Sequence, residues 1–219
     1  MNIGVKMILS IGAAAALCSC GQGEKKTQDT DFHYLLDEFA DLKVIRFRVP
    51  GWDNLSLRQK EYAYHLSEAA KLGRDITWDQ YCKWNLPVRH VVEDILNEYD
   101  GDRECADFQN FTVYAKRLFF ANGIHHHYSE DKFFPECSRE YFQSLVEAVG
   151  DGEQAAELLE VIYSPDIYPQ RRSTSKTGDI VELSAVNFYD GVTREEVDKY
   201  YNSMMDPNDK TPISYGLNT

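Results

Sequence analysis

The chain has 219 residues, and its 23 Lys and Arg face 36 Asp and Glu, so its formal net charge is −13 at pH 7. This length suits one large domain or one lobe of a larger protein. The acidic balance argues against nucleic acid and anionic lipid as partners, because both are bound through clustered Lys and Arg.

The first residues have the pattern of a lipoprotein export signal. Lys6 is followed by an unbroken run of apolar and small residues, Met7–Leu17, which is too short to span a bilayer. Leucine then stands three residues, and serine one residue, before Cys20. We therefore expect residues 1–19 to be removed as a signal peptide and Cys20 to carry the lipid. An ordinary signal peptide that is cut elsewhere is the alternative.

A tether and a folded lobe are expected to follow the signal. Residues 20–31 are polar and contain glycine, as flexible linkers do, and residues 32–219 carry the apolar patterns of a folded lobe. The lipid on Cys20, and not charge, is expected to hold this exported protein at a membrane. The residue after Cys20 is glycine and not aspartate. In a producer with two membranes, we therefore expect the outer one.

The lobe contains three cysteines, Cys82, Cys105 and Cys137. An odd number leaves at least one free thiol, and the lobe has no C-x-x-C pair. We therefore expect neither a disulfide framework nor a zinc site made of thiolates.

Amphipathic helices make up most of the predicted elements. Apolar residues at i, i+3, i+4 and i+7 indicate a first helix over Phe32–Phe39. Capping signals begin further helices at Ser56, Thr77 and Thr193, where Gln or Glu follows three residues later. The expected helices after the first cover residues 57–72, 78–84, 88–99, 108–119, 141–149, 155–162 and 194–205.

Strand signals are fewer. Apolar and basic residues alternate over Ile45–Val49 and stop at a Pro-Gly pair. Val181–Tyr189 is a second alternating run, and the polar stretch before it, Arg171–Gly178, is expected to be a mobile loop. A third apolar stretch, residues 211–219, ends before it can pair. The sequence therefore predicts an α+β lobe, mostly helical, with a small and incomplete β-sheet or barrel.

Three consecutive histidines follow the point where an apolar helical run stops at Asn122-Gly123. In an extended chain His125 and His127 share a face and could chelate a metal ion, with Glu130 or Asp131 as a third ligand. Adjacent histidines seldom converge on one ion. We expect them instead to line a cleft and to offer donors and acceptors to a polar ligand. A surface turn whose histidines bind the backbone is the remaining interpretation.

Catalytic motifs are missing from the sequence. No histidine is followed by glutamate, so the H-E-x-x-H pattern of zinc hydrolases is absent, and so is G-x-S-x-G. The sequence therefore predicts neither catalytic residues nor metal ligands in this chain.

The segment Phe119–Glu136 resembles the corresponding segment of bacterial members of the dipeptidyl peptidase III family of zinc metallopeptidases. The other stretches that resemble this family are Phe39–Gly51, Leu66–Asp75 and Ala185–Asn218. The resemblance thus runs from about Phe32 to the C-terminus.

The resemblance implies a two-lobed hydrolase that releases dipeptides from peptide N-termini. In this family one lobe holds zinc on an H-E-x-x-G-H helix, the other combines helices with a β-barrel core, and the peptide substrate binds between them. The chain resembles the β-containing lobe alone. The resemblance therefore implies an N-terminal portion that ends before the zinc-binding lobe and is inactive by itself.

The resemblance also assigns roles to individual positions. Tyr128 matches an aromatic residue that lines the substrate cleft, and Asn122-Gly123 match the turn that presents it. The alternative is a lipid-anchored lipoprotein that binds peptides or glycans on aromatic residues without turning them over. A decayed remnant without function is a third hypothesis.

Overall fold

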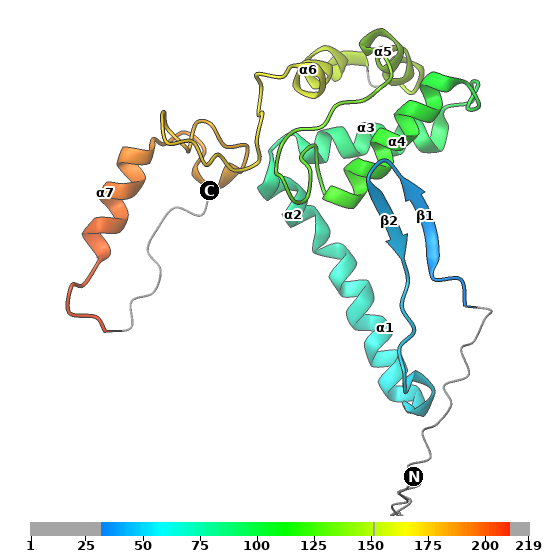
Figure 1. Ribbon diagram of the computed structural model, residues 1–219, viewed down its shortest axis with the longest axis horizontal. Coiled ribbons are helices and arrows are strands. Elements are labelled where there is room, and N and C mark those ends of the chain that lie inside the picture. The colour runs from blue at the N-terminus through cyan, green and yellow to red at the C-terminus, as the bar shows by residue number, and fades with distance from the viewer. Residues whose placement is uncertain (1–31, 151, 211–219) are drawn as a thin grey trace, which may run out of the picture. The chain divides into compact units, whose positions relative to one another are not determined.

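The computed structural model describes residues 32–150 and 152–210 (Figure 1). The expected signal peptide, the whole of the expected tether with Cys20, and the apolar stretch after residue 210 lie outside the described residues. The elements described below belong to one compact unit that begins at Leu35.

The described chain combines helices with one two-stranded antiparallel sheet, which confirms the predicted α+β class. The strands are β1 (Leu35–Phe39) and β2 (Leu42–Ile45). The helices are α1 (Leu57–Leu72), α2 (Arg74–Tyr81), α3 (Asn85–Glu98), α4 (Ala106–Ala121), α5 (Arg139–Ala148), α6 (Gly152–Tyr163) and α7 (Arg194–Met204), with short 3-10 helices η1 (Trp52–Asn54) and η2 (Asn187–Tyr189).

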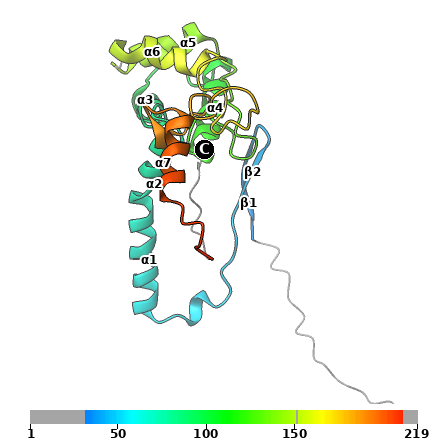
Figure 2. The same ribbon diagram turned by 90° about the vertical axis from the view of Figure 1, so that its left-hand side faces the viewer.

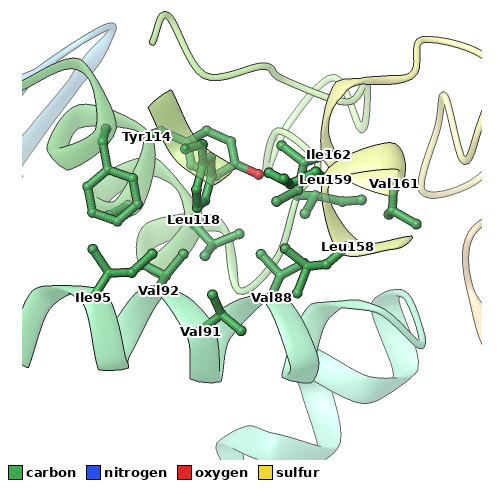
Figure 3. Packing of buried hydrophobic residues seen from close by; sticks show 14 of the residues in the cluster. Val88, Val91, Val92, Ile95, Tyr114, Leu118, Leu158, Leu159, Val161 and Ile162 are labelled. Carbon is green, nitrogen blue, oxygen red and sulfur yellow. The ribbon is translucent and has the colours of Figure 1, made fainter. Parts of the chain in front are cut away.

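Helices α3 to α6 surround the hydrophobic core. Helix α3 packs against α2, α4 and α5, and α5 packs against α6, as both ribbon views show (Figures 1 and 2). The apolar stripe of α3 faces side chains from α4 and α6 (Figure 3). The residues labelled there are Val88, Val91, Val92 and Ile95 of α3, Tyr114 and Leu118 of α4, and Leu158, Leu159, Val161 and Ile162 of α6. The stripes predicted for these helices are confirmed.

The predicted first helix is wrong, because residues 35–39 form a strand. Ala40 adopts a positive φ of 49°, and the turn that it forms pairs Phe39 with Leu42 and Leu35 with Ile45. The apolar residues that suggested a helical face are partly exposed, 41% for Leu35 and 58% for Leu36, so they do not mark a buried face. The spacing of a few apolar residues is a weak signal where none of them is buried.

The hairpin is attached to the helical core by polar contacts. Lys116 Nζ of α4 donates a hydrogen bond to Asp37 Oδ2 at 2.7 Å. The same ammonium lies 5.4 Å from the centroid of the Phe39 ring. Because Asp37 accepts this bond, its pKa lies below the ordinary value for a carboxyl.

Three further sequence predictions differ from the structure. The strand predicted over Ile45–Val49 is wrong except at its first residue, because strand β2 covers Leu42–Ile45 and ends there. Helix α2 begins at Arg74, so the capping signal predicted at Thr77 lies inside the helix. The strand predicted over Val181–Tyr189 is wrong. Local hydrogen bonds to Asp179 close a turn there, from the backbone N–H groups of Val181 and Leu183. Side-chain and backbone bonds of this kind compete with strand pairing.

Candidate functional site

The histidine segment begins at a sharp turn after α4. Asn122 takes the left-handed conformation that ends the helix, with φ 56° and ψ 43°, and asparagine tolerates this conformation better than most residues. Gly123 follows with φ 150°. A Cβ at this position would lie 2.3 Å from Nδ2 of Asn85, so the turn requires glycine.

The fully buried side chain of Asn85 holds this turn in place. Its Oδ1 accepts the backbone N–H of Ile124 at 3.1 Å. Its Nδ2 donates to the carbonyl of Trp78 at 3.0 Å and to that of Asn122 at 3.5 Å. One amide therefore joins the end of α2, the start of α3 and the turn after α4, and this fixes where the histidine segment leaves the core.

Residues 124–133 then form an irregular hairpin. The backbone N–H of Phe133 donates to the carbonyl of Ile124 at 3.2 Å, and that of His126 donates to Asp131 at 2.8 Å. Near the tip, the N–H of Glu130 donates to the carbonyl of His126 at 3.0 Å. The residues between His126 and Glu130, including Tyr128, therefore lie on a loop whose base is held by backbone hydrogen bonds.

Two more backbone segments join the hairpin edge to edge. The N–H of Arg171 donates to the carbonyl of Glu130 at 2.8 Å, and the N–H of Val186 donates to the carbonyl of Arg171 at 3.2 Å. Single bridges therefore connect residues 125, 132, 131, 170 and 184 outside the named strands. These bridges add to the two-stranded sheet β1–β2, and the segment expected to be the second strand contributes the single bridge at Ser184.

The buried side chain of Lys132 anchors the same hairpin to α6. Its Nζ donates to the carbonyls of Val161 at 2.8 Å, Ser164 at 2.5 Å and Ile167 at 2.5 Å. These carbonyls lie at and beyond the C-terminal end of α6, where a positive charge is favourable. Burial lowers the pKa of Lys132 to about 8. This role of Lys132 was not predicted from the sequence, where its only signal is a lysine followed by two phenylalanines.

Glu130 is engaged by two guanidinium groups. Arg171 donates to it at 2.5 Å, and Arg172 binds both carboxylate oxygens. Arg172 is the main cause, with Arg171, of a Glu130 pKa of about 2. The Arg171 guanidinium also lies 4.2 Å from the centroid of the Tyr81 ring. A carboxylate that is held in this way is not available as the third metal ligand that the sequence analysis considered.

The predicted site residues separate into buried and exposed positions. His125 is 2% exposed, and its Nε2 donates to the carbonyl of Tyr168 at 2.9 Å, so it lies in the interior and not on a cleft wall. His127 is half-buried between the rings of Phe120 and Tyr128. Tyr128 is 87% exposed at the tip of the loop.

A shallow hollow of about 420 Å³ lies beside the loop tip. It is lined by Tyr128, Ser129, Glu130, Gln170, Arg172 and Thr174. The exposed ring and the polar side chains around it can offer one apolar contact and several hydrogen bonds to a ligand.

The described residues do not fit a zinc site. No group of three or more His, Cys, Asp or Glu among residues 32–150 and 152–210 is arranged to hold a metal ion. The thiols Cys82, Cys105 and Cys137 are free. Burial raises the pKa of the Cys82 thiol to about 11, which disfavours the thiolate that zinc requires.

Comparisons with known proteins add no assignment: no family model matches the chain, and a search of curated proteins found no match. Within the described part of the chain, no helix is both long and apolar enough to cross a membrane.

Proposed function

We propose that this chain is the substrate-binding, N-terminal part of an exported zinc dipeptidyl peptidase of the dipeptidyl peptidase III type. The observation that carries the proposal is the position of Tyr128. This residue, which resembles a cleft aromatic of that family, is 87% exposed at the tip of a loop whose base is held by backbone hydrogen bonds. A large aromatic side chain held in water by a braced loop is a suitable contact for a ligand.

The bracing around the loop supports a binding role for Tyr128 over a packing role. Asn85 fixes one end of the hairpin, Lys132 fixes the other, and Arg171 joins the hairpin to the next segment. Residues that position a ligand work best on such a supported base. The role proposed for these residues is to bind and orient the peptide substrate. We assign no catalytic step to them, since the described residues do not fit the zinc that the family uses.

The same proposal places the protein at a membrane through a lipid on Cys20, with the outer membrane as the expected location. Incorporation of labelled fatty acid tests this part. We expect Cys20→Ala to abolish labelling and Cys18→Ala to leave it unchanged. Labelling that persists in the Cys20 variant contradicts the proposal.

The first test of the enzymatic part is the nucleotide sequence that follows the codon for Thr219. A continuing frame that encodes an H-E-x-x-G-H motif supports the proposal, and an unrelated sequence after a stop codon contradicts it. The chain by itself is expected to release no dipeptides from chromogenic substrates and to bind no stoichiometric zinc, measured by elemental analysis. Zinc-dependent release by this chain alone would overturn this division of roles.

Tyr128→Ala tests the cleft assignment in the longer protein. We expect kcat/KM for peptides to fall by the value of one aromatic contact, on the order of 1 kcal/mol, with zinc content and melting temperature unchanged. Leu36→Ala, which removes an exposed apolar side chain from β1, is the matched control. A Tyr128 variant that unfolds, with normal kinetics in its folded fraction, would instead give the ring a packing role.

A further inference from the structure

The middle histidine of the three bonds the loop tip itself. From the sequence, His125 and His127 were the two expected to act in the site. In the structure the Nδ1 of His126 accepts the backbone N–H of Tyr128 at 3.2 Å and that of Ser129 at 3.1 Å. The His126 side chain is 21% exposed. One ring nitrogen therefore holds the backbone of the residue that we propose to contact the peptide.

These contacts have the pattern of a helix N-cap. The carbonyl of His126 accepts the N–H of Glu130, four residues on, while the side chain accepts the N–H groups of the second and third residues after it. Asparagine and aspartate make the same side-chain bonds at an N-cap through an oxygen at the δ position. The Nδ1 of histidine stands at that same position in its side chain. The cap therefore fixes the turn over residues 127–129, which presents Tyr128.

The bonds of the His126 ring determine which of its nitrogens carries the proton. Because Nδ1 accepts two N–H groups, it is the unprotonated nitrogen, and the proton lies on Nε2. Nε2 then donates to Oδ2 of Asp41 at 3.2 Å. The pKa of Asp41 lies below the ordinary value for a carboxyl, because its own backbone N–H and, to a smaller extent, the His126 ring donate to it. Asp41 is therefore the charged acceptor that this tautomer needs.

Asp41 connects the loop tip to the β1–β2 hairpin. It follows Ala40 in the turn between the two strands. The hairpin is itself attached to α4 by the bond from Lys116 to Asp37. A carboxylate that accepts one ring N–H fixes both the tautomer and the orientation of an imidazole. The hairpin thus supports the loop through the carboxylate of Asp41.

We propose that His126, oriented by Asp41, is the positioning residue that holds Tyr128 in its exposed conformation. We assign the ring no contact with the peptide. Its Nδ1 fixes the backbone of Tyr128 and Ser129, and fixing a contact residue before binding reduces the conformational entropy that binding costs. The consequence for peptide binding rests on the proposed function, whereas the effect on the loop can be measured without a peptide.

Two substitutions separate the roles of the two ring nitrogens. His126→Asn keeps an acceptor at the δ position and loses the link to Asp41, whereas His126→Gln can reach Asp41 and loses the δ acceptor. Amide hydrogen exchange, followed by NMR in the full chain with Cys20→Ala to prevent lipidation, measures the effect. We expect the amides of Tyr128 and Ser129 to exchange about tenfold faster or more in His126→Gln. In His126→Asn their rates should stay within about threefold of those in the parent chain.

Further variants and amides serve as controls. The N–H of Phe133, which donates to Ile124 at the base of the hairpin, should keep its exchange rate in every variant, and this excludes general unfolding. His65→Gln, at an exposed position of α1, should leave the loop amides unchanged. Asp41→Ala should accelerate their exchange about threefold, because the ring loses its orienting partner, and Asp41→Asn, which keeps an acceptor, should not.

The tautomer of His126 is read from the ¹⁵N chemical shifts of its ring, and we expect the proton on Nε2. A proton on Nδ1 overturns the proposal. So does loop exchange that His126→Gln leaves unchanged, or that His126→Asn accelerates as much as His126→Gln does.

Titration with tri-alanine, followed through the NMR signals of the loop, connects the loop to the proposed function. His126→Gln should weaken binding about fivefold, as Tyr128→Ala does, and His126→Asn should retain it. A His126→Gln variant that binds as tightly as the parent chain overturns the positioning role. Absence of binding by the parent chain contradicts the proposed function instead, and the exchange rates then decide the role of His126.

Discussion

Helices α1 and α3 have similar lengths, 16 and 14 residues, but opposite surroundings. Helix α1 starts at Ser56 with a capping box that Gln59 completes, and none of its described residues is buried. Helix α3 follows Trp84, which makes no side-chain cap bond, and five of its residues are buried. Capping thus marks where a helix begins, whereas apolar spacing determines what the helix packs against. The two signals are independent. Helix α1 has the stronger capping signal, and α3 has the stronger apolar stripe.

Truncation of apolar side chains should show the largest difference between α1 and the helical core to which α3 and α5 belong. Phe142 of α5 is fully buried and contacts the rings of Phe111 and Tyr114. We expect Phe142→Ala to lower the free energy of unfolding by about 3–5 kcal/mol, because it leaves a cavity. Leu72→Ala, at the exposed end of α1, should change it by about 0.5 kcal/mol or less. Urea unfolding curves measure the change in the free energy of unfolding for both variants. Similar losses of stability in the two variants would contradict the expected difference between the core and α1.

The next largest effect concerns pH and the interior histidine. Burial lowers the pKa of His125 to about 4, from an ordinary value of 6.5. As the pH falls from 6.5 to about 4, the unfolded chain takes up a proton that the folded chain does not. The free energy of unfolding should therefore fall by about 3 kcal/mol over this range.

His125→Gln keeps a donor for the Tyr168 carbonyl but does not titrate. We expect this variant to lose most of the slope between pH 6.5 and about 4, in urea unfolding measured at several pH values. His65→Gln, in the exposed helix α1, is the matched control and should keep the slope. A wild-type slope in the His125 variant would show that other groups are responsible.

Loss of the helix cap should have a smaller effect on stability, and this effect should be confined to α1. Ser56 Oγ accepts the backbone N–H of Gln59 at 3.3 Å. We expect Ser56→Ala to destabilise α1 by about 1 kcal/mol, because the cap is lost. Since α1 contributes little to the core, its amide protons should exchange faster while those of α3 and α4 keep their rates. Slower or unchanged exchange in α1 would mean that the helix is held by something other than its cap.

Much of the fold could be predicted because its signals are local. The capping boxes at Ser56 and Thr193 are present, and the stripes that include Val88 and Leu118 lie in the core. The hairpin at residues 35–45 was not predicted. Its strand pairing depends on the turn at Ala40, and alanine gives no sequence signal for the positive φ that it adopts.

The candidate site was harder to predict, since its support comes from distant residues. Tyr128 is exposed at the loop tip, its role in a substrate cleft stays a prediction, and the turn at Asn122-Gly123 lies at the end of the predicted helix. The interior position of His125 depends on the carbonyl of Tyr168, 43 residues away. Lys132 binds carbonyls about 30 residues further along the chain. No spacing within the histidine segment could reveal either contact.

The close approach of Gly123 to Asn85 has a consequence for recognising related chains. The amide of Asn85 occupies the space where a side chain at position 123 would begin, and it also bonds the backbone on both sides of that glycine. Neither residue can change without disturbing the other. Across homologous sequences we expect these two positions, 38 residues apart, to vary together or not at all. A search that requires both the asparagine and the glycine should therefore separate true relatives from chains that merely contain consecutive histidines.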